Sequence, residues 1–281
     1  MVFTLTKAES GNKKNNKNTK KDEEFSYGYL LQVLAGGLYP NKMHVLRECI
    51  QNSYDSLKEF SSIKRDLPIE PIHIFIKNSS IFVHDSGMGM NEQKLHEFRK
   101  IGFSTKNPEE SVGFQGIGKL AGISVAKKLI VTTSMYNDSQ KHTLVFDAEG
   151  ALEELKKWKK EGKNPTLNHL VKSYTTIKSF PEDKEKHYTF LELKDIRDDA
   201  IDILNEAEVM GYIARNCPVL FDPQFKYAKQ IDERLKLFVP DYWNVSIKVN
   251  GKEIFKPYLS NLNQPEFLEV KIVEEDKSIA F

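Results

Sequence analysis

The stretch "GFQGIGKL", Gly113 to Leu120, contains the residue types that bind a phosphate group. Its glycines precede a predicted helix, so backbone N–H groups and the positive end of that helix would point at an anion. A P-loop has Ser or Thr as its magnesium ligand where this chain has Leu120, and it follows a strand, whereas "NPEESV" before Gly113 is a loop. The pattern therefore predicts a phosphate loop of another kind, with its magnesium ligand elsewhere.

A second stretch, "VHDSGMGM" from Val83 to Met90, could hold a flat polar ligand. A predicted strand brings Asp85 to its end, and Gly87 and Gly89 let the backbone pass close to such a ligand. A carboxylate in that place accepts a hydrogen bond from an exocyclic amine. The alternative is an ordinary turn, because D-x-G-x-G alone is a weak signal.

The third stretch, "RECIQNSYD", carries Glu48, Asn52 and Asp55 at spacings of four and three residues. On a helix these spacings put the three side chains on one face, opposite the apolar residues that bury it. Such a stripe is either a solvated helix surface or an acid and an amide presented to a site. The spacing alone leaves both interpretations open.

Together, and in this order, the three stretches resemble the motifs of the GHKL or Bergerat-fold ATPases, which include gyrase B, the ninety-kilodalton heat-shock chaperones, histidine kinases and MutL. "RECIQNSYD" resembles the first motif, "DSGMG" the second, and the glycines Gly113, Gly116 and Gly118 the third. A fourth motif places a Thr on a late strand. Thr189 is the candidate, although Tyr188 stands where Gly is usual.

The similarity is greatest to the heat-shock chaperone branch, the HtpG-like proteins. "LYPNKMHVLRECIQNSYDSL" and "IGFSTK" both resemble sequences of that branch, and MORC-type ATPases share parts of the pattern. The resemblance covers about residues 25–195. It implies ATP and Mg²⁺ as the bound cofactors.

The resemblance also implies a role for each motif residue. The side-chain carbonyl of Asn52 would bind magnesium together with phosphate oxygens, because this ion prefers oxygen ligands. Glu48 would orient or deprotonate the attacking water as the catalytic residue. Asp85 would bind the adenine amino group, supported by Thr189 directly or through water, and Gly89 would let the chain turn beneath the base.

The remaining expected cofactor contacts surround these residues. They are Asp55, Gly87, Met90, Lys106, Gly113, Gly116, Ile117, Gly118, Lys119 and Leu120. Asp55 has helix capping or a surface ion pair as its alternative role. Lys106 would reach the terminal phosphate when a lid closes, or is a solvated loop lysine. Lys119 contacts phosphate or lies at the surface, and His44 tunes Glu48 or is structural.

The resemblance implies an α+β fold, an α/β sandwich in which helices cover one face of a mixed sheet. Helices are predicted at 40–60, 91–101 and 118–126, and strands at 72–77, 81–85, 127–136, 141–148 and 187–196. The predicted organisation is a flexible polar arm at 1–24, the ATP-binding domain at 25–197 and a transducer-like second α/β domain at 198–281. That second domain has predicted helices near 199–213 and 224–237 and strands at 244–251 and 267–275. The chain ends directly after the last strand, so the second domain is interpreted as incomplete.

Bulk composition excludes several classes. The 41 basic and 40 acidic residues give a net charge of +1, so no global field attracts nucleic acid or membrane, although a local basic patch is compatible. Cys49 and Cys217 lack CxxC spacing, which argues against a disulfide framework or a zinc site. The polar N-terminus and the lack of an 18-residue apolar run favour a cytoplasmic protein without a membrane span.

The expected function is magnesium-dependent ATP binding and hydrolysis that drives lid closure and homodimerisation in a chaperone-like or DNA- or defence-linked machine. A client protein or a DNA-linked partner is expected. One alternative is a nucleotide-gated scaffold in which ATP occupancy matters more than turnover. Another is a phosphotransferase of the histidine-kinase type, although no dimerisation helix with a target His is evident.

Overall fold

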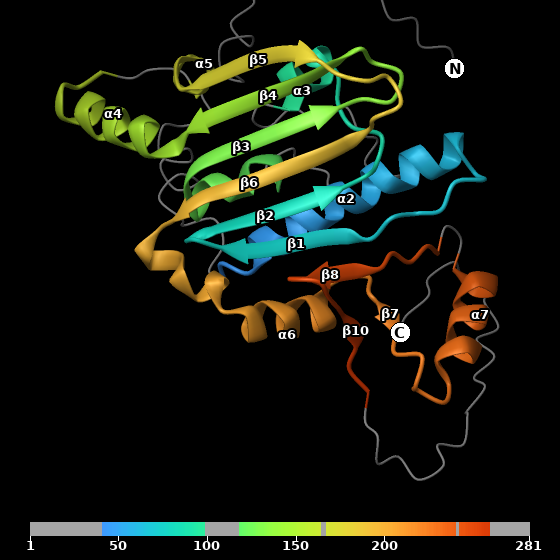
Figure 1. Ribbon diagram of the computed structural model, residues 1–281. Helices are drawn as coiled ribbons and strands as arrows, with labels where there is room; N and C mark the ends of the chain where they lie inside the picture. Colours follow the sequence, from blue (N-terminus) through green and yellow to red (C-terminus); the bar gives the residue numbers. More distant parts are fainter. Residues whose placement is uncertain (1–40, 99–117, 164–166, 240–241, 259–281) are drawn as a thin grey trace, which may run out of the picture.

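The computed structural model describes residues 41–98, 118–163, 167–239 and 242–258 (Figure 1). Its elements are α2 (His44–Ile63), β1 (Ile72–Lys77), β2 (Ser80–Asp85), α3 (Glu92–Phe98), the 3-10 helix η1 (Gly118–Ser124), β3 (Ala126–Ser134), β4 (Gln140–Asp147), α4 (Ala148–Lys160), α5 (Leu167–Ser173), β5 (Thr175–Pro181), β6 (Tyr188–Ile196), the 3-10 helix η2 (Asp198–Leu204), α6 (Glu206–Asn216), β7 (Leu220–Phe221), α7 (Ala228–Phe238), β8 (Ile247–Val249), β9 (Lys252–Glu253) and β10 (Phe255–Lys256).

One eight-stranded sheet organises the fold, in the order β5-β4-β3-β6-β2-β1-β8-β9. Its pairs are antiparallel except for β1 with β8, which makes the sheet mixed. In Figure 1, α2 and α3 lie behind the sheet, and no described helix lies in front of β1, β2, β6 or β3. The predicted fold class, an α+β sandwich with helices on one face of a mixed sheet, is confirmed.

Helix α2 is the element that carries the polar stripe. It begins after Asn41, whose side-chain oxygen accepts a hydrogen bond from the Met43 N–H at 2.9 Å. Its start at His44 lies four residues after the predicted one. The face turned to the sheet is apolar apart from one serine and consists of Val45, Leu46, Cys49, Ile50, Ser53, Leu57 and Phe60. Burial of this face fixes which way the polar stripe points.

The predicted strand pair before the D-x-G-x-G stretch is present as β1 and β2. Asn78 and Ser79 have φ angles of 48° and 57° and form a two-residue turn with the twist that suits a hairpin. Ser80, predicted as part of the turn, instead pairs with Lys77. The hairpin sets the register that brings Asp85 to the end of β2.

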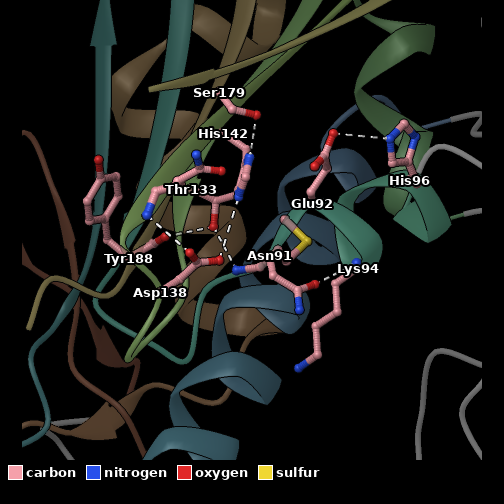
Figure 2. A network of polar contacts seen from close by, with 11 residues as sticks. Asn91, Glu92, Lys94, His96, Thr133, Asp138, His142, Ser179 and Tyr188 are labelled. Atoms are coloured by element: carbon pink, nitrogen blue, oxygen red, sulfur yellow. Dashed lines mark hydrogen bonds and ion pairs between the residues drawn. The ribbon is translucent and has the colours of Figure 1, made fainter. Parts of the chain in front are cut away.

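Three local features differ from the sequence-based expectation. Residues 118–124 form a 3-10 helix, and α5 and β5 were not predicted at all. β5 is an edge strand whose residues are mostly exposed, so it lacks the apolar alternation that reveals a strand. It is held to β4 by the ladder and by a 2.8 Å hydrogen bond between Nδ1 of the buried His142 and Oγ of Ser179 (Figure 2).

The chain after residue 197 contributes to the same sheet. The helix predicted at 199–213 is two helices, η2 and α6, because Asn205 ends the first and caps the second by accepting the Ala207 N–H at 3.1 Å. β8 then pairs with β1 across the proposed boundary, and the division at 197/198 stays a prediction. The sequence also predicts a helix at 25–39 and a loop rich in Gly, Ser and Pro at 102–116. Both segments, and the predicted strand at 267–275, lie outside the described residues. Among the described helices, none combines the length and the apolarity needed to cross a bilayer.

Candidate functional site

A cavity of about 380 Å³ lies between α2, the end of β2, α3 and β6. Six of the predicted cofactor contacts line it: Asn52, Asp55, Asp85, Gly89, Met90 and Thr189. These residues come from four parts of the chain, and the sheet register brings them together. Asp85 on β2 lies directly opposite Thr189 on β6, and Thr189 lies directly opposite Thr133 on β3.

Asp85 is a buried acid, only 2% exposed. Burial disfavours its ionised form and raises the pKa of the carboxyl group to about 7. Hydrogen bonds from Ser53, from the Gly87 N–H at 3.0 Å and from Ser56 pull the pKa the other way without cancelling the effect of burial. A carboxylate in this state gains from a ligand that donates a hydrogen bond to it.

The loop after Asp85 needs both of its glycines. Gly89 has a φ of +68°, and a Cβ there would overlap the carbonyl oxygen of Ser134. A Cβ on Gly87 would come within 2.6 Å of the backbone carbonyl carbon of Ser56. The loop is therefore squeezed between α2 and the end of β3, and only glycine fits at these two positions.

Hydrogen bonds from three sides fix this loop. The Met88 N–H donates to the Ser56 carbonyl on α2 at 3.1 Å, and the Met88 carbonyl accepts from the Tyr136 N–H at 3.1 Å. His187 donates through Nδ1 to the Gly87 carbonyl at 2.9 Å and stacks on Phe60, with ring centroids 3.9 Å apart. The cavity wall is thus preorganised by α2 and both flanking strands.

Thr133 links that loop to β6. Its hydroxyl accepts from the Met90 N–H at 2.9 Å and donates to the Tyr188 carbonyl at 2.8 Å, and its oxygen is 3.4 Å from the Thr189 hydroxyl. Figure 2 shows Thr133 beside Tyr188 and the start of α3, where Asn91 caps the helix through the Lys94 N–H at 2.8 Å. An Asn before the first turn is a typical N-cap, and the sequence predicts this one from "NEQKLHEFRKI".

Asn52 and Asp55 present oxygen atoms to the same cavity. Among the described residues no hydrogen bond engages the Asn52 amide, while Asp55 accepts one from Gln51 Nε2 at 3.1 Å. Within the described ranges, no three His, Cys, Asp or Glu side chains gather as a metal site would require. One amide oxygen with a nearby carboxylate suits a hard ion such as Mg²⁺ that keeps most of its ligands as water and phosphate.

Glu48 does not line this cavity but a neighbouring hollow of about 250 Å³. Arg47, Gln51, Asn216 and Cys217 share the walls of this hollow, and Arg47 Nη2 lies 3.7 Å from Glu48 Oε1. The Glu48 side chain is 22% exposed. The acid is therefore one helical turn from Asn52, but the structure does not bring it into the cavity that holds the other predicted residues.

The remaining residues predicted to belong to the site do not line either hollow or lie outside the described residues. The His44 ring lies 6.1 Å from the Tyr212 ring at a tilt of 39°, a contact that fits the structural alternative for this histidine. Gly118, Lys119 and Leu120 form the first turn of η1. Lys106, Gly113, Gly116 and Ile117 lie outside the described residues. Their roles, like those of all the site residues, stay predictions.

Four supporting residues were missed by the sequence-based reasoning: Ser53, Ser56, Thr133 and His187. The two serines carried a usable signal, because they lie on α2 at positions that flank the Asn52–Asp55 stripe and small polar residues on a buried helix face need partners. The other two carried none. Thr133 and His187 contribute only through strand register, which a single sequence does not reveal.

Residues 41–189 match the family described as histidine kinase-, DNA gyrase B- and HSP90-like ATPases. The match covers more than half of the chain and includes Glu48, Asn52, Asp85 and Thr189. The chain belongs to this family, as the three motifs predicted.

Among individual proteins, the chain is similar to bacterial chaperone proteins HtpG. Identity is 25% over 190 residues with HtpG of Wolinella succinogenes, a match that takes in 54% of this chain and 31% of that protein. It is 27% over 153 residues for Rickettsia prowazekii, covering 47% and 25%, and 28% over 184 residues for Wigglesworthia glossinidia brevipalpis, covering 57% and 27%. The chain thus spans about a quarter to a third of the length of these relatives.

Proposed function

We propose that this protein binds ATP in the cavity beside α2 and hydrolyses it with Mg²⁺. The observation that carries the proposal is the buried Asp85 carboxyl group, which faces the cavity between a glycine-dependent loop and Thr189. A buried acid with a raised pKa and with no cationic partner among the described residues suits a hydrogen-bond-donating ligand such as the adenine amino group.

In this proposal each wall of the cavity binds one part of the nucleotide. Asp85 accepts the hydrogen bond from the adenine amino group, and Thr189 supports the base from β6. Gly89 and Met90 form the surface beneath the base, on a loop that Thr133 holds in place. Asn52 and Asp55 bind the phosphate end, to which the Gly113–Leu120 stretch contributes its backbone N–H groups.

The residues present fit a magnesium ion through the Asn52 carbonyl oxygen. When bound, the ion would neutralise charge that builds up on the terminal phosphate oxygens. Asp55, already held by Gln51 at 3.1 Å, would contact the ion's water shell. This arrangement uses one direct protein ligand, which is typical of Mg²⁺ at nucleotide phosphates.

Glu48 is the proposed general base for the attacking water. One helical turn, about 5.4 Å of rise, separates it from Asn52, so a water on the terminal phosphate lies within reach. In the structure its carboxylate faces Arg47. The proposal therefore requires the side chain to turn from Arg47 towards Asn52 when ATP binds.

At the level of the whole protein, we propose ATP-driven lid closure by the segment near Lys106, with homodimerisation and a client protein or DNA-linked partner. The HtpG relatives support a chaperone-like machine. A scaffold that uses ATP occupancy without turnover is the second candidate, and the observation in its favour is the separation of Glu48 from the cavity.

Calorimetry with Mg-ATP, combined with steady-state hydrolysis, tests the proposal. Asp85→Asn should weaken binding about 10- to 100-fold, because a hydrogen bond to a charged group is worth about 1.5–3 kcal/mol. Glu48→Gln should bind ATP normally and lose turnover. Glu153→Gln, an exposed glutamate on α4, serves as the matched control and should change neither measurement.

The outcomes separate the two candidates. Binding without turnover in the parent would favour the scaffold, and equal turnover in the parent and in Glu48→Gln would remove Glu48 as the base. If Mg-ATP does not bind the parent protein, or binds Asp85→Asn equally well, the site assignment is wrong.

A further inference from the structure

The face of the sheet turned away from α2 carries a row of aromatic side chains. Successive side chains of a strand point to opposite faces of the sheet. In each strand, the residues that alternate with the buried core residues therefore lie on this open face. One register row runs directly across seven strands and consists of Lys248, His73, His84, Phe190, Thr132, Thr143 and Lys178. The row has aromatic or imidazole rings in its middle and a lysine on each side, and Glu253 on β9 lies opposite Lys248.

The rings on this face form one connected patch, here called the ring patch, made of His73, Phe75, Phe82, His84, Tyr188 and Phe190. Phe75 lies parallel to His73 at 6.0 Å with an interplanar angle of 4°, and His73 lies 6.3 Å from His84. The His84 ring in turn lies 6.1 Å from Phe190 and 6.4 Å from Tyr188, and Phe190 lies 5.6 Å from Phe82. Phe75 is 40% exposed, so the patch reaches solvent.

Lysines surround the ring patch. Those that alternation places on the open face are Lys77, Lys128, Lys141, Lys178, Lys194 and Lys248, against the acids Asp147, Glu192 and Glu253. Lys141 pairs with Glu182 at 3.4 Å. None of the other five lysines has an ion-pair partner among the described residues.

Two of these lysines lie directly opposite each other. Lys128 on β3 is the register partner of Lys194 on β6. Like charges directly opposite in a sheet are destabilising, and an anion between them would relieve the repulsion. Lys128 also lies opposite Asp147 on β4, and Lys248 lies opposite Glu253 on β9. The open face therefore combines flat apolar rings with more lysines than acids.

A second hollow continues the ring patch past the end of β2. It has a volume of about 380 Å³, and its walls include the rings of Phe60, His84, His187 and Tyr188 together with Lys64 and Lys186. His84 and Tyr188 belong to both features. Two acids, Glu70 and Glu185, share its lining, and Lys186 is paired with Glu182 at 3.2 Å, so the hollow adds apolar ring surface to the patch and no net positive charge.

We propose that the open face of β1, β2, β6 and β3 binds single-stranded nucleic acid. Bases stack on exposed aromatic rings whatever their sequence, and lysines at the margins contact the phosphates. A duplex hides its base faces and could use only the lysines. An apolar protein surface could use only the rings and would leave five unpaired lysines facing it.

This proposal is independent of the ATP site, which uses the other face of the same strands. Asp85 and Thr189 point into the ATP cavity, whereas His84, Tyr188 and Phe190, their neighbours in sequence, point to the open face. Oligonucleotide binding can therefore be measured without ATP, and either proposal can fail alone.

The test is fluorescence anisotropy of a labelled twenty-nucleotide poly-dT strand with the full chain, at 50 to 200 mM salt. Phe75→Ala should weaken binding about fivefold to a hundredfold, the loss expected for one base–ring stack. Phe75→Trp should keep the affinity. The matched control is Phe238→Ala, because Phe238 is an exposed phenylalanine on α7 and 65% exposed; it should change nothing.

A second pair of variants tests the phosphate contacts and leaves the ring patch unchanged. Lys178→Ala and Lys248→Ala lie at exposed or partly exposed strand positions, and each should lower the slope of log affinity against log salt by about 0.7. The proposal is overturned if Phe75→Ala binds the strand like the parent, or if a blunt duplex binds as tightly as the single strand. The proposal is also overturned if the strand does not bind and the protein instead self-associates through this face.

Discussion

Asp85 and Thr189 are direct partners across β2 and β6, and both face the cavity beside α2. The pairing places an acid whose pKa is raised to about 7 beside a hydroxyl that is 3.4 Å from that of Thr133. Hydrogen bonds from Ser53, Ser56 and the Gly87 N–H offset only part of the effect of burial on the ionised form of Asp85, so the protein keeps this group buried at a cost in stability. Such a cost is common where a group is reserved for a ligand.

That cost predicts how stability depends on pH. Between about pH 4 and pH 7 the folded protein holds a proton on Asp85 that the unfolded chain releases, so this group makes the protein less stable as pH rises. Asp85→Asn cannot ionise and should escape the loss. Relative to the parent, its free energy of unfolding should rise with pH by up to about 4 kcal/mol at pH 7, at 1.36 kcal/mol per pKa unit.

Urea unfolding at pH 4, 5.5 and 7 measures this difference. Asp66→Asn, at an exposed aspartate, controls for the removal of a carboxylate as such. A constant difference between Asp85→Asn and the parent at all three pH values would show that Asp85 is not a desolvated acid.

The cavity was predictable in part because its polar residues lie on elements with strong periodic signals. The spacing of Asn52 and Asp55 on α2, and the position of Asp85 at the end of a strand, both follow from local pattern. Glu48 shows where local pattern fails. Helical spacing puts it on the same stripe as Asn52, but α6 and the chain after it form a separate hollow around it.

Long-range register was the part that the sequence did not reveal. Thr133 and His187 act on the loop after Asp85 only because β3 and β6 are neighbours in the sheet. The ring patch has the same origin, since His73 and Phe190 are far apart in sequence and meet only through β2. Strand β5 escaped prediction for a different reason, because an exposed edge strand has little apolar alternation.

A second prediction concerns Gly89 in the loop after Asp85. It separates two costs of replacing this glycine, the backbone strain of a positive φ angle and the steric overlap of a new Cβ. Gly89 and Gly162 have nearly equal φ angles of +68° and +67°, but a Cβ at Gly162 has nothing within 4 Å. Gly162→Ala should therefore cost only the strain of a left-handed residue, about 1–2 kcal/mol. Gly89→Ala should cost about 1–3 kcal/mol more, because the new methyl group overlaps the Ser134 carbonyl.

Thermal or urea unfolding of the two variants gives this comparison directly. ATP affinity adds a second readout, since only Gly89→Ala shifts the loop that carries the proposed base-binding surface. Equal losses of stability for the two variants would mean that the loop can move away from Ser134 and is not tightly packed.

The last prediction concerns Thr133, whose hydroxyl joins two strands and the loop. Thr133→Val keeps the shape and removes the acceptor of the Met90 N–H and the donor to the Tyr188 carbonyl. Leaving such buried groups unpaired should cost about 1–3 kcal/mol of unfolding free energy. ATP affinity should fall as well, because Met90 lines the cavity and loses its anchor.

Thr132→Val is the matched control: it lies one residue away on the open face, where it loses only the 3.2 Å contact with Thr143. Its cost should stay below about 1 kcal/mol, since valine suits a partly exposed strand position. A Thr133→Val protein with the stability and the ATP affinity of Thr132→Val would show that the hydroxyl does not hold the loop.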